Sequence, residues 1–287
     1  RKASEELKQR IQKQVGVNTR ALPIGTFHAL ANRAIKSLAH LIDVDVPEKV
    51  LNEFERKAII KEITDSYPNL CKELKFADKI PSAVLASIDA FRERLLTPEE
   101  ASNEADEMGD LIQIAHAELY THYDTHLSQH AKIDYARMIQ FAVKAFTADA
   151  NADKSYIKQF EHILVDEFQD INFAQKSMVD QLLRGGASLW VVGDDDQAIY
   201  GWRGASIRNI LEFERDYADA RVVTLEQNYR STANILGTAD RVIANNSRRK
   251  KKQLKTDAAA GEPIRIFLDS TSHDEAERIA TEIADAI

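Results

Sequence analysis

The chain has 287 residues and a net charge of -8, with 46 acidic against 38 basic side chains. This balance argues only weakly against a nucleic-acid binder, because DNA responds to the local potential of a groove. The single cysteine, Cys71, excludes an intrachain disulfide and is typical of a reducing, cytoplasmic compartment. No apolar run approaches the about 20 residues that span a bilayer.

The start of the chain predicts a short strand and then a helix. Leu22 to Ile24 is a strand candidate. Thr26 is placed to cap the helix that follows, which should continue to about Leu41.

Residues 43–131 predict an inserted all-helical domain. Apolar residues recur there at three- and four-residue steps, and no strand is expected. The four prolines of this stretch should divide it into separate helices, because proline is tolerated in a first turn but not in a helix interior. The apolar positions are Phe54, Ile59, Ile63, Val84, Leu85, Ile88, Leu111, Ile112, Ala115 and Leu119, and the prolines are Pro47, Pro68, Pro81 and Pro98.

Strands and helices alternate in the remainder, which predicts a parallel α/β sheet. Its strands should read as continuous apolar runs, as buried parallel strands do. We expect helices at 133–146, 173–183, 207–217, 232–244 and 275–286, and strands at 163–165, 189–192, 221–225 and 264–268. The strand at 221–225 should open a second unit.

The most informative segment is His162-Ile-Leu-Val-Asp-Glu-Phe-Gln-Asp170. An apolar strand ends there in two adjacent acids, Asp166 and Glu167. P-loop nucleotidases use carboxylates in such a place to hold Mg²⁺ and to orient an attacking water. Two acids that merely cap the next helix are the plainer interpretation, and the pair alone would not exclude it.

Two later blocks favour the nucleotidase. They are Leu189-Trp-Val-Val-Gly-Asp-Asp-Asp-Gln-Ala-Ile-Tyr-Gly-Trp-Arg-Gly-Ala205 and Leu225-Glu-Gln-Asn-Tyr-Arg-Ser231. With the acidic segment and its D-E-x-Q-D pattern, they resemble motifs II, III and IV of the UvrD/Rep family of superfamily 1 DNA helicases. Upstream, Arg1-Lys-Ala-Ser-Glu-Glu-Leu-Lys-Gln-Arg-Ile11 is similar to the end of motif Ia, and Gly25-Thr-Phe-His-Ala-Leu30 to motif Ib.

The resemblance implies a fold and a division into domains. The fold would be a RecA-like P-loop NTPase sheet with an inserted helical subdomain and part of a second RecA-like lobe. Residues 1–42 would begin lobe 1A with motifs Ia and Ib, and residues 43–131 would be the insertion 1B. Residues 132–217 would complete lobe 1A with motifs II and III, and residues 218–287 would start lobe 2A with motif IV.

The phosphate-cradling G-x-x-x-x-G-K-[ST] loop occurs nowhere in the 287 residues. In the family this loop lies before motif Ia, and motifs V and VI follow further along than this chain extends. We therefore expect a fragment of a larger helicase, which by itself should be monomeric and should hydrolyse almost no ATP.

The resemblance implies roles in ATP chemistry, with ATP and Mg²⁺ as cofactors. Asp166 would bind Mg²⁺, and Glu167 would polarise the attacking water. Gln197 has an amide that can both donate and accept, so it can sense the γ-phosphate. Tyr229 would stack on the adenine, and Arg230 would reach the γ-phosphate as an arginine finger. A surface arginine beside a tyrosine is the alternative for this last pair.

Other residues are candidates for DNA contact. Trp202 offers a flat face for stacking on a base, although an ordinary core tryptophan is the alternative. Tyr200 and Arg203 lie beside it, and Thr26, Phe27 and His28 should face the DNA backbone. The run Arg248-Arg-Lys-Lys-Lys252 with Lys255 could contact phosphate, but most such runs are solvated.

The function implied by the resemblance is a 3′-to-5′ DNA helicase that couples ATP hydrolysis to movement on single-stranded DNA and to unwinding at duplex junctions. Two alternatives stay open. One is a helicase-nuclease recombination subunit, and the other is a non-hydrolysing DNA-binding module derived from a helicase. The intact Asp166-Glu167 pair argues against the second.

Overall fold

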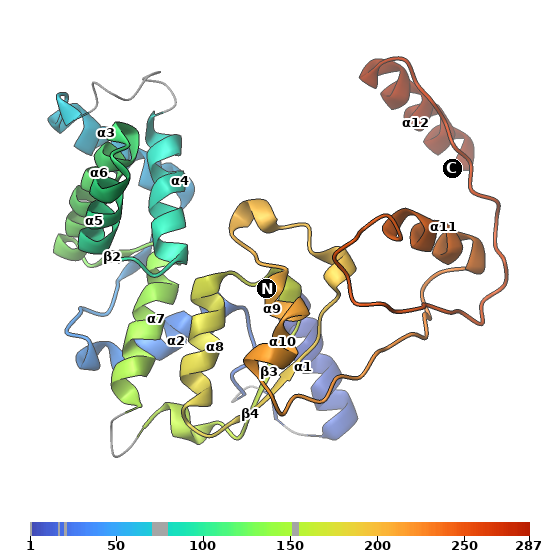
Figure 1. The fold of residues 1–287 in the computed structure, drawn as a ribbon, viewed down its shortest axis with the longest axis horizontal. Coiled ribbons are helices and arrows are strands. Elements are labelled where there is room, and N and C mark those ends of the chain that lie inside the picture. The colour runs from blue at the N-terminus through green and yellow to red at the C-terminus, as the bar shows by residue number, and fades with distance from the viewer. Residues whose placement is uncertain (1, 17, 20–21, 71–79, 151–154) are drawn as a thin grey trace. The chain divides into compact units, whose positions relative to one another are not determined.

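The computed structural model describes residues 2–16, 18–19, 22–70, 80–150 and 155–287. It divides the chain into two compact units, Arg1–Phe213 and Glu214–Ile287, and each is described by itself. The chain is mostly helical, with two small parallel sheets (Figure 1). Among the described residues no helix has the length and apolar character to cross a membrane.

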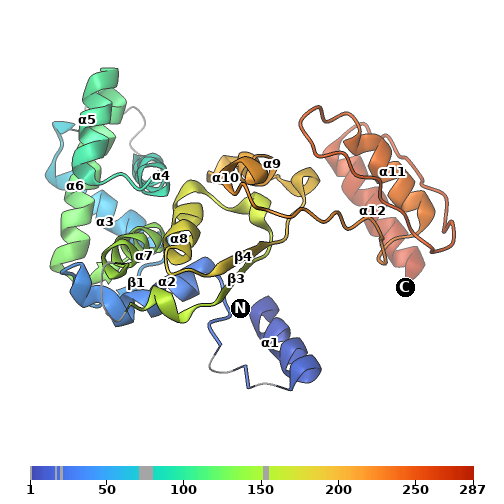
Figure 2. The ribbon, with the colours of Figure 1, turned by 60° about the horizontal axis from the view of Figure 1, so that its bottom comes forward.

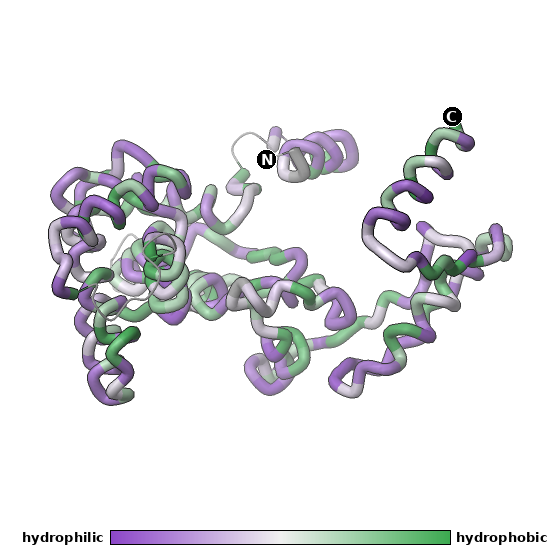
Figure 3. The backbone as a smooth tube through the Cα atoms, turned by 90° about the horizontal axis from the view of Figure 1, so that it is seen from above, coloured by the Kyte–Doolittle hydropathy of each residue, from purple (hydrophilic) through white to green (hydrophobic). Residues whose placement is uncertain are grey.

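The first unit begins with helix α1 (Lys2–Val15), which is hydrophilic along almost its whole length (Figure 3). Helix α2 (Phe27–Leu38) follows, and its predicted cap is confirmed, because the Ala29 amide donates to Thr26 Oγ1 over 3.3 Å. A 3-10 turn, Ala39–Leu41, then prolongs the helical path to the predicted end. The expected strand at Leu22 to Ile24 is wrong: the Ile24 amide bonds back to the Leu22 carbonyl, so this segment turns.

Helix α7 (Tyr135–Asp149) packs between α2 and α8 (Phe173–Leu183). Small side chains line this contact, including Ala31, Ala34, Ala142 and Ala145, all fully buried. Ile133 lies in a strand rather than in the predicted helix, because Asp134 caps α7 by accepting from the Arg137 amide at 2.9 Å.

The predicted insertion contains helices α3 (Glu53–Ser66), α4 (Ile80–Glu93), α5 (Pro98–Met108) and α6 (Leu111–Gln129). The expectation of no strand is wrong. Strand β1 (Lys49–Val50) precedes the helices, β2 (Lys132–Ile133) follows them, and the two strands pair in parallel. The chain therefore enters and leaves this helical group at adjacent points (Figure 1).

The helix ends of the insertion follow local sequence signals. Asn52 and Thr97 each form a capping box, with Glu55 and Glu100 respectively. Pro98 occupies the first turn of α5, and Gly109 ends that helix in the left-handed conformation that glycine adopts readily. The prolines therefore separate the helices as predicted.

A closed apolar core joins α3, α4, α5 and α6. Its buried members include Ile60, Val84, Ile88, Leu119 and Leu127. Three of the predicted apolar positions are exposed instead of buried. Phe54 is 82% exposed, and Leu111 and Ile112 are also exposed, all three in the first turn of a helix.

The same core contains a buried charge network centred on Arg92 and Asp134, neither of which is exposed to solvent. Arg92 Nη1 donates to Asp134 over 2.5 Å, and Nη2 donates to Asp124 over 2.8 Å. Arg56 also lies 3.3 Å from Asp134, and the Tyr123 hydroxyl donates to it over 3.0 Å. These contacts join α3, α4 and α6 to the first residue before α7.

Strand β3 (His162–Val165), helix α8 and strand β4 (Ser188–Val191) form the predicted parallel unit. The two strands lie side by side (Figure 2). Their register pairs Ile163 with Leu189 and Val165 with Val191. These side chains pack on one face with Phe168 and Val179. Successive residues of a strand alternate between faces, and on the other face Leu164 is 76% and Trp190 64% exposed.

The segment after the second block departs from the predicted helix 207–217. It forms two short helices, α9 (Arg208–Leu211) and α10 (Phe213–Asp216), with Glu212 between them in a non-helical conformation.

The second unit contains helices α11 (Ala233–Ile243) and α12 (Ser272–Ala286), as predicted within a few residues. The predicted strands 221–225 and 264–268 are wrong. Both segments lack ladder partners among the described residues, and side chains such as Val223, Ile266 and Leu268 are exposed. A β-strand requires hydrogen bonds to a neighbour, which an apolar run alone does not supply.

Candidate nucleotide and DNA site

Asp166 and Glu167 follow β3 directly, and both are exposed. Two backbone bonds fix this point against β4: the Val192 amide donates to the Val165 carbonyl at 2.9 Å, and the Phe168 amide donates to the Val192 carbonyl at 3.0 Å. Glu167 has a φ of 52°, so its backbone lies in the left-handed region, which residues other than glycine rarely adopt. The chain thus turns sharply at Glu167, the carboxylate for which the resemblance implies contact with the attacking water.

A buried glutamine joins this turn to the next block. Gln169 Nε2 donates to Glu167 Oε2 at 2.8 Å, and its Oε1 accepts from the Asp194 amide at 2.9 Å. Burial, and then the negative charge of Glu167, raises the pKa of the neighbouring Asp170. The carboxylate of Glu167 therefore acts on Asp170 through space.

Gln197 lies in the loop after β4, in a 3-10 turn, Asp195–Gln197. Its side chain is exposed, and its Nε2 donates to Asp194 Oδ2 at 2.7 Å. A continuous series of hydrogen bonds therefore runs from Glu167 through Gln169 and Asp194 to Gln197. All three predicted ATP-site residues of the first unit, Asp166, Glu167 and Gln197, are exposed, and each belongs to this series or lies next to it.

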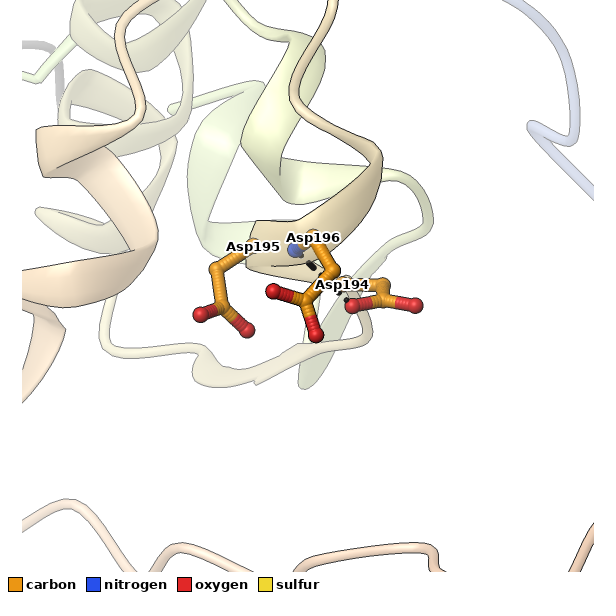
Figure 4. Close-up of side chains that lie close together, drawn as sticks. All are labelled: Asp194, Asp195 and Asp196. Atoms are coloured by element: carbon orange, nitrogen blue, oxygen red, sulfur yellow. Dashed lines mark hydrogen bonds between the residues drawn. The ribbon is translucent and has the colours of Figure 1, made fainter. Parts of the chain in front are cut away.

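Three consecutive aspartates, Asp194, Asp195 and Asp196, place carboxylate oxygens within 4.8 Å of one another (Figure 4). The sequence analysis did not single them out as ligands. Asp194 already accepts from the Asp196 amide at 3.0 Å and from Gln197, as the cap of the turn. This acidic cluster is accounted for as a turn-forming element.

The same loop presents aromatic rings. Trp202 is 80% exposed, and Tyr200 is also exposed, with the two ring centres 6.4 Å apart and inclined by 50°. The exposure of Trp202 contradicts the core interpretation and leaves a ring face accessible. The backbone of Arg203 belongs to the 3-10 turn Gly201–Arg203, and its side chain lies outside the described part of the chain.

The Ib-like residues divide between packing and exposure. Phe27 packs between two apolar clusters, and Thr26 is exposed while it caps α2. The ring of His28 meets the ring of Tyr135 edge-on, 5.1 Å between centres. Tyr135 is exposed and was missed by the sequence analysis, because a lone tyrosine at a helix start carries no motif signal.

The motif IV-like residues belong to the second unit. Asn228 Oδ1 accepts from the amides of Arg230 and Ser231 at 2.9 and 2.8 Å, which turns the chain and leaves Tyr229 90% exposed. The segment is held by Lys255, whose carbonyl accepts from the Asn228 amide at 2.7 Å. Of the basic run, Lys250 forms an ion pair with Glu214 at 2.7 Å.

Comparison with known proteins accounts for almost the whole chain. The family described as UvrD/REP helicase N-terminal domain matches residues 1–218, and the UvrD-like helicase C-terminal domain matches residues 223–287. The protein named ATP-dependent DNA helicase PcrA from Staphylococcus epidermidis is 36% identical over 98% of this chain. Its counterpart from Staphylococcus aureus is also 36% identical over 98%. The chain spans 38% of the length of each relative.

Proposed function

Because the chain belongs to the UvrD/REP helicase family, we propose that it supplies part of the ATPase and DNA-gripping machinery of a 3′-to-5′ DNA helicase. The observation that carries the proposal is the hydrogen-bonded series from Glu167 to Gln197, in a loop that also exposes Trp202. The loop after β4 thus holds candidate contacts for both the nucleotide and the DNA, and hydrogen bonds connect it to the turn at Glu167.

Asp166 and Glu167 have the chemistry that ATP hydrolysis requires. Carboxylate oxygens suit Mg²⁺, so Asp166 would hold the ion, which neutralises charge on the phosphates when bound. Glu167 orients a water whose oxygen bonds to the γ-phosphorus, while the bond to the β,γ-bridging oxygen breaks and its electron pair leaves on ADP. The proton of the water passes to the phosphate product.

The loop after β4 couples the two ligands. Gln197 contacts the γ-phosphate, and Trp202 stacks on an unpaired base, five positions later in the chain. A change at Gln197 when phosphate leaves is therefore transmitted to the grip on DNA through a short backbone path. Tyr200, Arg203, Thr26, Phe27 and His28 are proposed as additional DNA contacts, and the exposed Tyr135 joins them because its ring touches His28.

The second unit contributes Tyr229 and Arg230, which we assign to the adenine and the γ-phosphate. An arginine supplied by another lobe can neutralise charge that develops in the transition state. The tight turn at Asn228 supports this assignment, because it exposes both side chains.

The decisive experiment measures ATP hydrolysis and DNA binding by the complete gene product. Glu167→Gln should lower DNA-stimulated ATP hydrolysis by at least about a hundredfold and leave DNA affinity nearly unchanged, because the amide keeps the shape but loses the charge. Trp202→Ala should instead weaken single-stranded DNA binding by about 1 to 3 kcal/mol.

The same measurements separate the alternatives. A wild-type protein that binds DNA but hydrolyses no ATP would support the non-hydrolysing module. Loss of DNA binding in Glu167→Gln would show that Glu167 acts elsewhere. The isolated 287-residue chain, which contains no G-x-x-x-x-G-K-[ST] sequence, should hydrolyse almost no ATP.

A further inference from the structure

We propose that Gln169 is a positioning residue that holds Glu167 in its working orientation and fixes the loop containing Gln197 relative to it. This role rests on the proposed function, since it concerns the same reaction. It assigns a function to a residue that touches neither nucleotide nor DNA in the roles given above, and whose side chain is 1% exposed.

The two partners of Gln169 determine the orientation of its amide. The Asp194 backbone N–H can only donate, so the carbonyl oxygen of the amide must face it at 2.9 Å. A carboxylate accepts hydrogen bonds, so the NH₂ group faces Glu167 Oε2 at 2.8 Å. Glutamine satisfies both partners at once, whereas a carboxylate in its place could not donate to Glu167.

The surroundings of Gln169 leave little room for movement. A Cβ atom added to Gly193 would lie 2.7 Å from Gln169 Oε1 and 2.7 Å from Ile210 Cδ1. The absence of a side chain at Gly193 therefore lets the loop approach the amide closely. The glutamine is enclosed between the turn after β3 and the loop after β4.

The position of Glu167 makes this support important. Its backbone lies in the left-handed region, and its carboxylate is exposed, so local packing does not fix the side chain. The Gln169 bond is a restraint on that carboxylate from the protein interior. Through Asp194, the same amide is connected to Gln197, and one side chain thereby sets the spacing between two groups assigned to the γ-phosphate.

The test uses the complete gene product with Gln169→Met and Gln169→Glu. Methionine keeps the length but removes both hydrogen bonds, so kcat for DNA-stimulated ATP hydrolysis should fall at least about tenfold, as misplaced catalytic groups cause. The KM for ATP and the affinity for single-stranded DNA should stay within about threefold of the wild type, since neither ligand touches Gln169.

Gln169→Glu gives a signature that a merely structural role would not produce. Burial beside Glu167 raises the pKa of the new carboxyl, and its protonated form can donate to Glu167 and accept from Asp194, as the amide does. The kcat of this variant relative to the wild type should therefore rise as the pH is lowered from 8.5 towards 6. The relative kcat of Gln169→Met should not depend on pH.

Gln175→Met is the matched control, because Gln175 is a capping-box residue of the nearby α8 whose bonds are local to that helix. Three results would each overturn the role. The control could lose as much kcat as Gln169→Met, or Gln169→Met could keep a kcat within twofold of the wild type. The kcat of Gln169→Glu, divided by that of the wild type, could also be independent of pH. If Gln169→Met fails to fold, the pH dependence of the kcat of Gln169→Glu relative to the wild type decides. If the wild-type protein hydrolyses no ATP, the proposed function itself is refuted. That result is distinct from a failure of the Gln169 role, which leaves wild-type hydrolysis intact.

Discussion

Charged side chains are buried beside the helical insertion but exposed at the end of strand β3. Arg92 of the insertion and Asp134, which caps α7, are fully buried and bond to each other. At the end of β3, Asp166 and Glu167 face solvent, and Trp202 exposes most of its ring. Groups that stabilise the fold have partners inside the protein, whereas groups assigned to chemistry are left accessible to partners from outside.

The apolar residues show the same contrast. The insertion encloses its core between four helices. The β3–β4 sheet is covered by apolar side chains on one face only, and Leu164 and Trp190 remain exposed on its other face. Substitutions in the insertion should therefore reduce stability, and substitutions near the edge should change activity with little effect on stability.

The largest effect should come from Arg92→Met. Removing one partner of a buried ion pair leaves an uncompensated charge, so the free energy of unfolding should fall by about 3 to 5 kcal/mol. Urea denaturation followed by circular dichroism measures this change. Arg94→Met is the control: Arg94 pairs with Glu104 at a partly exposed site, where the loss should stay below about 1 kcal/mol. Equal losses in both variants would refute the contrast.

The second prediction concerns the stability of the buried charge network at low pH. Burial alone would raise the pKa of Asp134, but Arg92 and Arg56 hold that pKa below its ordinary value. A carboxylate with a lowered folded-state pKa contributes stability above its unfolded-state value, and that contribution is lost as the pH falls through the folded-state pKa. The protection of amides in α4 and α6 against hydrogen exchange, relative to their intrinsic exchange rates, should therefore fall below about pH 4, the ordinary aspartate range.

The amides of α8, which packs outside the charge network, serve as the internal reference for this acid experiment. Burial raises the pKa of Asp89, so its contribution has the opposite sign and reduces the net effect. Protection that falls earlier in α8 than in α4 and α6 would contradict the prediction.

The smallest effect should follow from Leu164→Thr on the open face of the sheet. Because Leu164 is mostly exposed, the free energy of unfolding should change by less than about 0.5 kcal/mol. Leu119→Ala, at a fully buried position of the insertion, should cost about 2 to 5 kcal/mol in the same urea experiment. A large loss at Leu164 would mean that this face is covered in solution.

Local signals were predictable from the sequence. The bounds of α8, the cap at Thr26 and the parallel pairing of β3 with β4 all follow from residue patterns within short windows. The order of the motif-like blocks identified the family, which the comparisons confirm. These features depend on near neighbours or on long, specific strings of residues.

Features that depend on distant partners were not predictable. Strand β1 exists because Lys49 and Val50 pair with residues more than eighty positions away. The role of Gln169 depends on an amide 25 positions later in the chain. Conversely, 221–225 and 264–268 have strand-like sequences, but pairing partners are absent from the described residues. The assignment of residues to lobes and of side chains to ligands stays a prediction.

The clasp formed by β1 and β2 has an evolutionary consequence. Because β1 and β2 are parallel, any connection from Val50 to Lys132 must cross back to the start of the pair, which takes about a dozen residues or more. A short crossover of that size could in principle replace the eighty-one residues between them. The four helices thus form an insertion that is attached to the rest of the chain through the paired strands β1 and β2. Lineages could lengthen, exchange or delete it while the scaffold that carries the acidic turn keeps its geometry.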